Sequence, residues 1–405
     1  MTESVVPEAG IPADMASLPD ADGLLSEAIA RTGLTDFGPI PFREPLEKVL
    51  GSLREESQLT QTGLDRLRDG IVNSLATRLQ LQAVHEAHPS IGRSAVAAPI
   101  IIIGLPRSGT TNLHSLLAQD TAHRVARTWE VSAPFPAVRE KDYWTDPRID
   151  AVQKFVEARG MMAEEIQAAL PYHATSPAEC GAILDHAFMS QYRQASARTP
   201  AWSRWRDHEA AWAPAFAFHK QFLQHLQTHY RAERWLLKSP EHLISIESLA
   251  ETYPDAIFIQ THRDPALVLG SVSSLICALR RMSSTQVDPV EVGREQFEMW
   301  AHGIDVTLAA RKKWGANRQV IDVRLADIAR DPLGTVESVY SQLGVPFTDQ
   351  ARSAMHAFVG GEESSREQKH NYRSRYELSD FGLDKDLIHE RFGPYMDGFG
   401  IAKGS

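Results

Sequence analysis

PIIIIGLPRSGTTNLHSLLAQ, Pro99 to Gln119, contains the strongest pattern in the chain. Ile100 to Ile103 form an unbroken run of β-branched residues, which is typical of a strand buried on both faces of a parallel sheet. Leucines then recur at helical spacing, at Leu113, Leu116 and Leu117. A strand, a glycine-containing loop and a helix in this order form a cradle for phosphate, because the loop amides and the positive end of the helix dipole point at a bound anion.

The loop differs at one position from the nucleoside-triphosphate P-loop, GxxxxGK[ST]. Residues 104–111 read GLPRSGTT, so Thr110 stands where that motif has its lysine. A triphosphate site uses the lysine to reach the outer phosphates. The positive charge is therefore expected from Arg107, inside the loop, where it could meet a bridging oxygen or a leaving group.

This loop resembles the 5′-phosphosulfate loop of sulfotransferases that use 3′-phosphoadenosine 5′-phosphosulfate (PAPS). Its PRSGTT form, with arginine in place of lysine, is similar to the tyrosylprotein and bacterial branches. The resemblance implies that PAPS is the sulfuryl donor and is released as adenosine 3′,5′-bisphosphate. It also implies that the donor contacts the cradle residues Pro106, Arg107, Ser108, Gly109, Thr110, Thr111 and Asn112.

A second motif, THRDPALVLGS, covers Thr261 to Ser271. Arg263 is expected at the end of a strand and Ser271 about two turns into the next helix, so both could converge on one phosphate. The motif resembles the 3′-phosphate segment of sulfotransferases, in which a serine follows an arginine by about eight residues. Such a segment favours PAPS over ATP, because ATP has no 3′-phosphate.

The resemblance also nominates two further catalytic residues. Lys238, in LLKSPEH, would steady the bridging oxygen as the sulfuryl group leaves, and Glu130, in RTWEVSAPFP, would be the general base. A base is needed because an alcohol or phenol must lose its proton as its oxygen attacks sulfur. His242 is an alternative base. Weaker rivals are Glu179, and Asp185 with His186.

Near the carboxyl end, VRLADIARDP resembles a sulfotransferase strand and turn, with Leu325 and Ala326 in place of its Tyr and Glu, a difference that concerns packing. A basic and aromatic cluster follows and could lie over the nucleotide as a flap. Its residues predicted to contact the cofactor are Lys369, His370, Tyr372 and Arg373. No metal-binding motif is present, and transfer of the less charged sulfuryl group does not require a metal.

Composition excludes several classes of protein. The formal net charge of −10 argues against general nucleic-acid binding, and two cysteines cannot build a disulfide framework. The amino terminus lacks the pattern of a signal peptide, and no apolar run approaches the roughly 20 residues that span a bilayer. A cytoplasmic protein without a transmembrane segment is expected.

Strands alternate with helices, which predicts an α/β fold: a three-layer, P-loop-like architecture with a central parallel sheet flanked by helices. We expect a flexible tail (1–22), a helical amino-terminal cap (23–97), the α/β domain (98–360) and a carboxyl-terminal flap and helix (361–405). Within the domain, a helical insertion at about 147–231 is assigned to the acceptor side. Its aromatic residues from Trp202 to Tyr230 are individually expected to fill the core.

The expected function is in-line transfer of a sulfuryl group from PAPS to a hydroxyl of a small-molecule or lipid-like acceptor. Two alternatives remain at this point. A P-loop kinase or NTPase would prefer ATP with magnesium, and a non-catalytic nucleotide-binding protein would keep the cradle without turnover.

Overall fold

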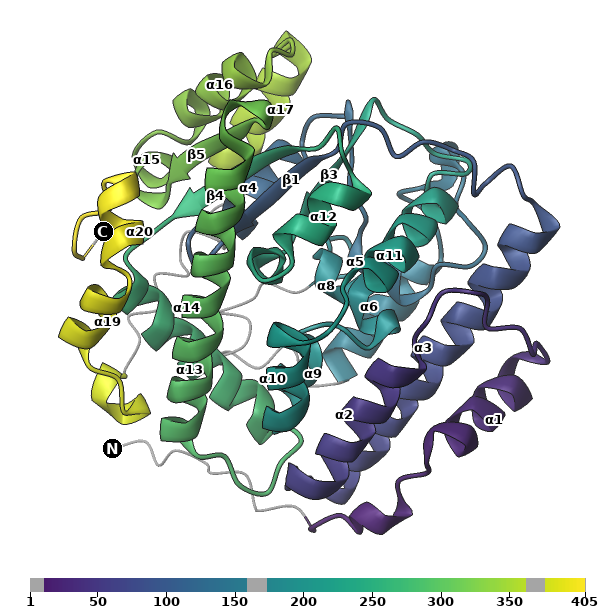
Figure 1. The fold of residues 1–405 in the computed structure, drawn as a ribbon. Helices are drawn as coiled ribbons and strands as arrows, with labels where there is room; N and C mark the ends of the chain where they lie inside the picture. Colours follow the sequence, from purple (N-terminus) through teal and green to yellow (C-terminus); the bar gives the residue numbers. More distant parts are fainter. Residues whose placement is uncertain (1–10, 159–172, 362–375, 405) are drawn as a thin grey trace.

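The computed structural model describes residues 11–158, 173–361 and 376–404. A five-stranded parallel sheet lies at its centre, with the strand order β2-β3-β1-β4-β5 (Figure 1). The strands are β1 (Ile100–Gly104), β2 (His123–Arg124), β3 (Arg234–Lys238), β4 (Ile257–His262) and β5 (Val320–Arg324). The predicted parallel α/β sheet is confirmed, and the cradle strand β1 is its central strand.

The residues of β1 alternate between two hydrophobic cores, as successive side chains of a strand must. Ile100 and Ile102 belong to the core beneath α4 (Thr110–Leu117), α16 (Pro332–Leu343) and α17 (Asp349–Gly360). Ile101 and Ile103 belong to a larger core on the opposite face. Helices on both faces therefore bury β1 completely, which explains why its sequence is apolar without alternation.

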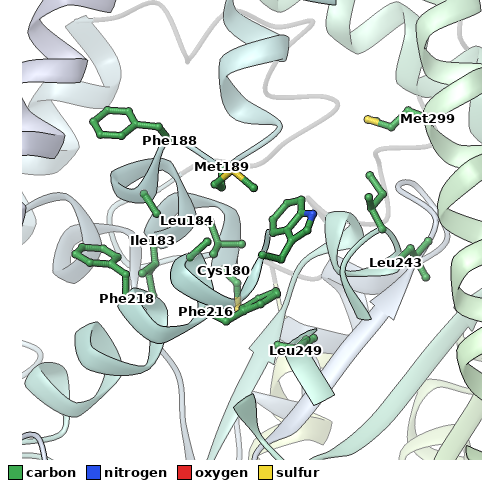
Figure 2. Close-up of a cluster of buried hydrophobic side chains, with 14 of the residues drawn as sticks. Cys180, Ile183, Leu184, Phe188, Met189, Phe216, Phe218, Leu243, Leu249 and Met299 are labelled. Carbon is green, nitrogen blue, oxygen red and sulfur yellow. The ribbon is translucent and has the colours of Figure 1, made fainter. Parts of the chain in front are cut away.

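The larger core is formed by helices from several parts of the chain. Figure 2 shows it where α8 (Cys180–Leu184), α11 (Ala213–Leu226), α12 (Ile246–Thr252) and α14 (Pro289–Trp314) meet. Six of the aromatic residues from the predicted acceptor side are buried in it, namely Trp202, Trp205, Trp212, Phe216, Phe218 and Phe222. They fill the core, as expected of them individually, and Tyr230 is partly exposed.

The amino-terminal cap contains three helices, α1 (Ala21–Thr32), α2 (Arg43–Glu56) and α3 (Gln61–Ala87), at one side of the molecule (Figure 1). Asp20 caps α1 by accepting from the amide of Gly23. Gly33 follows the helix in the left-handed conformation that ends many helices.

The remaining α-helices vary in length, from five residues in α5 and α9 to 17 in α13. They are α5 (Thr128–Ser132), α6 (Arg148–Ala158), α9 (Tyr192–Ser196), α10 (Pro200–His208), α13 (Pro265–Arg281), α15 (Leu325–Arg330), α19 (Lys385–Arg391) and α20 (Gly393–Phe399). Between β3 and β4, a 3-10 turn, η4 (Pro240–Leu243), precedes α12.

Candidate functional site

The cradle loop connects the end of β1 to α4 through three residues in left-handed backbone conformations: Gly104 (φ 141°), Arg107 (φ 63°) and Gly109 (φ 91°). A Cβ atom on Gly104 would clash with Thr261 Oγ1, and one on Gly109 would lie 2.7 Å from Leu325 Cδ1. Glycine is therefore required at both positions. The positive φ of Arg107, uncommon for a residue with a side chain, is the kind of strain found at ligand-binding loops.

Ser108 ties the loop to the neighbouring strand. Its side chain is fully buried, and its hydroxyl lies 2.5 Å from the carbonyl of Leu105 and 2.6 Å from Thr261 Oγ1 on β4. Gly104 and Thr261 pair in the register between β1 and β4, so the contact follows from the sheet. The Ser108 hydroxyl, which the sequence predicts to contact the sulfuryl donor, is thus bonded within the protein and stabilises the conformation of the loop. Sequence reasoning did not single out Thr261 for this role, although it begins the second motif.

Arg107, Arg263 and Ser271 lie together at the carboxyl end of the sheet. Arg107 Nε donates to Ser271 Oγ on α13 at 3.2 Å, and an Nη of Arg263 donates to the Arg107 carbonyl at 2.8 Å. Burial lowers the pKa of Arg107, and the positive charge of Arg263 lowers it further. Burial also lowers the pKa of Arg263. The lowered pKa values mean that the surroundings disfavour the charged form of both guanidinium groups.

These residues fit a polyanion. The Nε of Arg263 is buried, and among the residues that the structure describes it has no hydrogen-bond partner. A phosphate beside the two arginines would satisfy this donor and offset the repulsion between the guanidinium groups. The first amides of α4 have no acceptor within their own helix, which makes the cradle a second place for an anion.

The other cradle residues differ in exposure. Thr110 is buried, whereas Pro106, Thr111 and Asn112 are partly exposed on the loop and the first turn of α4. Leu325, which replaces the tyrosine of the family pattern, is the residue that packs against Gly109. The leucine at position 325 therefore packs against the cradle loop itself.

Lys238 reaches the cradle from β3, where it pairs with Ile102 of β1 in the sheet. Its ammonium group is 3.2 Å from Thr111 Oγ1 on α4 and forms an ion pair with Glu179 Oε1. The Lys238 side chain is 2% exposed and that of Glu179 is 18% exposed. Glu179 is the residue before α8, and its second oxygen lies 3.4 Å from the hydroxyl of Tyr192.

Glu130 lies within α5 and forms a buried ion pair with Arg124. Two Nη atoms of Arg124 contact its two carboxylate oxygens, one of them at 3.1 Å, and both side chains are 2% exposed. The hydroxyl of Tyr143 donates to Glu130 Oε2 at 2.6 Å, and the amide of Arg127 donates to the same oxygen at 3.1 Å. Both carboxylate oxygens of Glu130 are therefore occupied by protein donors, as in a buried structural ion pair.

The remaining candidates are placed as follows. His242 is fully buried in η4 against the ring of Phe216, and burial lowers its pKa well below the usual value. Asp185 forms an ion pair with Arg193 at 2.7 Å, and His186 stacks on Phe222. The predicted flap residues Lys369, His370, Tyr372 and Arg373 lie outside the described residues.

Within the described ranges, no cluster of three or more histidine, cysteine, aspartate or glutamate side chains is arranged to hold a metal ion. Over the same ranges, no helix combines the length and the apolarity that crossing a membrane requires.

The chain belongs to the sulfotransferase family, because the model of that family matches residues 99–349. This match spans the sheet, the cradle and the Arg263 motif. Over 258 residues the chain is 26% identical to the omega-hydroxy-beta-dihydromenaquinone-9 sulfotransferases Stf3 of Mycobacterium bovis and Mycobacterium tuberculosis, an alignment that covers 61% of this chain. The chain spans 63% of the length of these curated relatives.

Solved structures extend the similarity beyond the matched range. Sulfotransferase STF9 from Mycobacterium avium superposes with a TM-score of 0.84 at 28% identity, covering 96% of this chain and 99% of its own. Sulfotransferase STF1 from Mycobacterium tuberculosis H37Rv superposes with a TM-score of 0.80 at 29% identity, covering 93% and 98%. Such coverage includes most of the helical cap, which the sequence motifs do not reach.

Proposed function

We propose that this protein transfers a sulfuryl group from PAPS to a hydroxyl of a small-molecule or lipid-like acceptor. Membership of the sulfotransferase family supports the reaction class. The convergence of Arg107, Arg263 and Ser271 beside the cradle is the observation that carries the choice of donor. Two anion sites are needed for a nucleotide that bears a 5′-phosphosulfate and a 3′-phosphate. The cradle amides and the group formed by Arg107, Arg263 and Ser271 would supply them at one end of the sheet.

The proposal assigns each anion its own groups. The amides of the cradle and the first turn of α4 hold the 5′-phosphosulfate, and Arg263 and Ser271 hold the 3′-phosphate. Arg107 contacts Ser271 in the protein alone, and its role at the bridging oxygen stays a prediction from its place in the loop. Lys238, which already lies against Thr111, stabilises negative charge on the leaving phosphate. These fixed positive groups lower the barrier by electrostatic preorganisation, which needs no covalent intermediate on the protein.

For the general base we favour Glu179 over Glu130. The Glu179 carboxylate contacts Lys238, which itself touches the cradle, and its side chain is 18% exposed. Its Oε1 is held by Lys238, but the contact of Tyr192 with its Oε2 is long, at 3.4 Å. Oε2 can therefore accept a proton from an acceptor hydroxyl as the hydroxyl oxygen bonds to sulfur and the bond from sulfur to the bridging oxygen breaks. Glu130 as base stays a prediction from the family resemblance. Its oxygens would first have to leave Arg124, Tyr143 and the Arg127 amide.

The acceptor class is proposed from the relatives. The mycobacterial Stf3 proteins carry an omega-hydroxylated menaquinone in their name, so a hydroxyl at the end of an apolar molecule is the proposed substrate here as well. We also propose a cytoplasmic location, which agrees with the two buried, unpaired cysteines, Cys180 and Cys277.

The proposal is tested with adenosine 3′,5′-bisphosphate, the product of the donor, and the variant Arg263→Ala. Loss of a charged hydrogen bond should weaken binding by about 1.5 to 3 kcal/mol, which is roughly 10- to 150-fold in Kd. Isothermal titration calorimetry measures this. Arg281→Ala, an exposed arginine on α13, is the matched control and should leave the Kd unchanged. Equal affinity of parent and Arg263→Ala would remove Arg263 from the donor site.

A further inference from the structure

Arg263 lies between two buried side chains that both contact the carboxyl-terminal segment. His262 is the last residue of β4 and Asp264 is the residue before α13, and both are almost completely buried. The carboxyl-terminal helix α19 lies against α13, and α20 lies against His262 at the end of β4 (Figure 1). The family match ends at residue 349, so this contact is made by a part of the chain outside it.

On one side of Arg263, the carboxylate of Asp264 is shared by three donors. Its Oδ1 accepts from the amide of Ala266 at 2.9 Å and lies 3.0 Å from His389 Nε2 on α19. Its Oδ2 accepts from the amide of Gly404 at 2.6 Å. Because an ionised carboxylate can only accept, His389 Nε2 carries the proton and donates it. Two of the three bonds thus come from the carboxyl-terminal segment.

On the other side, His262 connects β5 to Tyr395 on α20. Its Nε2 lies 2.8 Å from Asp322 Oδ1 and its Nδ1 lies 3.1 Å from the Tyr395 hydroxyl. Burial lowers the pKa of His262, so the ring is neutral, Nε2 donates to Asp322, and the Tyr395 hydroxyl donates to Nδ1. Burial raises the pKa of Tyr395, and a hydrogen bond from the Arg263 backbone opposes that shift. Tyr395 therefore holds the residue directly before Arg263.

We propose that His389 and Tyr395 are positioning residues that fix the backbone at Arg263 and so aim its guanidinium at the 3′-phosphate of the donor. Neither residue needs to touch the donor. The inference rests on the proposed function only for the identity of the ligand, since the bonds that hold the 262–264 segment are present in the protein alone. We call these two residues the carboxyl-terminal clamp.

The test uses the full chain with the clamp variants Tyr395→Phe and His389→Ala. Tyr395→Phe removes a single hydroxyl and keeps the buried ring, so it is expected to fold. Arg391→Ala is the matched control, because Arg391 lies on α19 and pairs with Asp305 at the surface. The Kd of adenosine 3′,5′-bisphosphate is measured by calorimetry below the unfolding transition, and amide hydrogen exchange is measured by mass spectrometry over residues 261–268.

Each clamp variant should raise the Kd by about 2- to 30-fold, the usual range for residues that act on a site from outside it. Exchange over 261–268 should become faster in both variants, and the control should change neither quantity. Parent-like Kd and exchange in folded Tyr395→Phe would overturn the clamp. If the parent does not bind the bisphosphate, the proposed function fails, and the exchange measurement still decides whether the clamp holds the segment.

Discussion

Replacing Glu130 by glutamine distinguishes a structural carboxylate from a general base. The glutamine side chain would have nearly the same shape as the native one, but it would leave the guanidinium of Arg124 buried without a counter-charge. Arg124 is fully buried and lies against the rings of Tyr143, Tyr230 and Trp235. The neutral amide would also place a donor against the donors of Arg124 or Tyr143.

The expected cost is about 3 to 5 kcal/mol, the range for removing one partner of a buried ion pair. A chain of this length, 405 residues, unfolds with an entropy of about 0.85 kcal/mol per kelvin near its transition. The cost therefore corresponds to a drop in Tm of about 4 to 6 °C. A general base with a free carboxylate oxygen would give a different result, because its replacement lowers turnover and leaves the Tm nearly constant.

Differential scanning calorimetry of the parent, Glu130→Gln and Glu140→Gln measures this difference. Glu140 is exposed and only ten residues away, so its variant should unfold with the parent. An unchanged Tm for Glu130→Gln, together with a loss of sulfuryl transfer of roughly 100-fold or more, would refute the structural role and restore Glu130 as the base.

Three further outcomes follow from the site and the core. Glu179→Gln should lower turnover by roughly 100- to 10,000-fold while the Kd of the bisphosphate stays within about twofold; full activity would exclude Glu179 as the base. Gly109→Ala should cost about 1 to 2 kcal/mol in urea unfolding because of its left-handed backbone, whereas Gly360→Ala, which has open space around it, should not. Burial lowers the pKa of His219 to about 3 and that of His225 to about 4. Below about pH 6.5 the unfolded state therefore binds more protons than the native state. Each histidine then lowers the free energy of unfolding by up to about 1.4 kcal/mol for each pH unit of acidification. Burial also raises the pKa of Glu241 to about 7, which acts in the opposite direction, so thermal unfolding of the parent is compared with that of His225→Gln between about pH 7.5 and pH 5.5. The Tm of the parent should fall more on acidification, and an equal fall in both proteins would contradict the prediction.

The central part of the fold could be predicted from local sequence because its signals are local. Four isoleucines specify a strand buried on both faces, and β1 has these bounds within one residue. Leu113, Leu116 and Leu117 specify α4, and Gly33 specifies the end of α1. The parallel direction of the strands followed from their alternation with helices, which brings the ends of β1, β3 and β4 to one edge.

What the sequence could not provide were partners distant along the chain. Arg124 is only six residues before Glu130, but nothing in the local sequence shows that the two side chains pair. Tyr143, which donates to the same carboxylate, is thirteen residues away. The pairing of Lys238 with Glu179 joins positions 59 residues apart. The contact between His389 and Asp264 spans 125 residues. Such contacts depend on tertiary packing, which periodicity and motif spacing do not predict.

The central claim is that the cradle and Arg263 together bind a nucleotide with phosphates at both the 5′ and the 3′ positions. A thermal-shift titration tests it most directly, with adenosine 3′,5′-bisphosphate compared with adenosine 5′-phosphate and with ATP plus magnesium. At about 100 times its Kd, a ligand stabilises the native state by roughly 2.7 kcal/mol. We predict a corresponding rise in Tm with the bisphosphate, and none with the other two nucleotides at equal concentration. Stabilisation by ATP with magnesium, and none by the bisphosphate, would contradict the account.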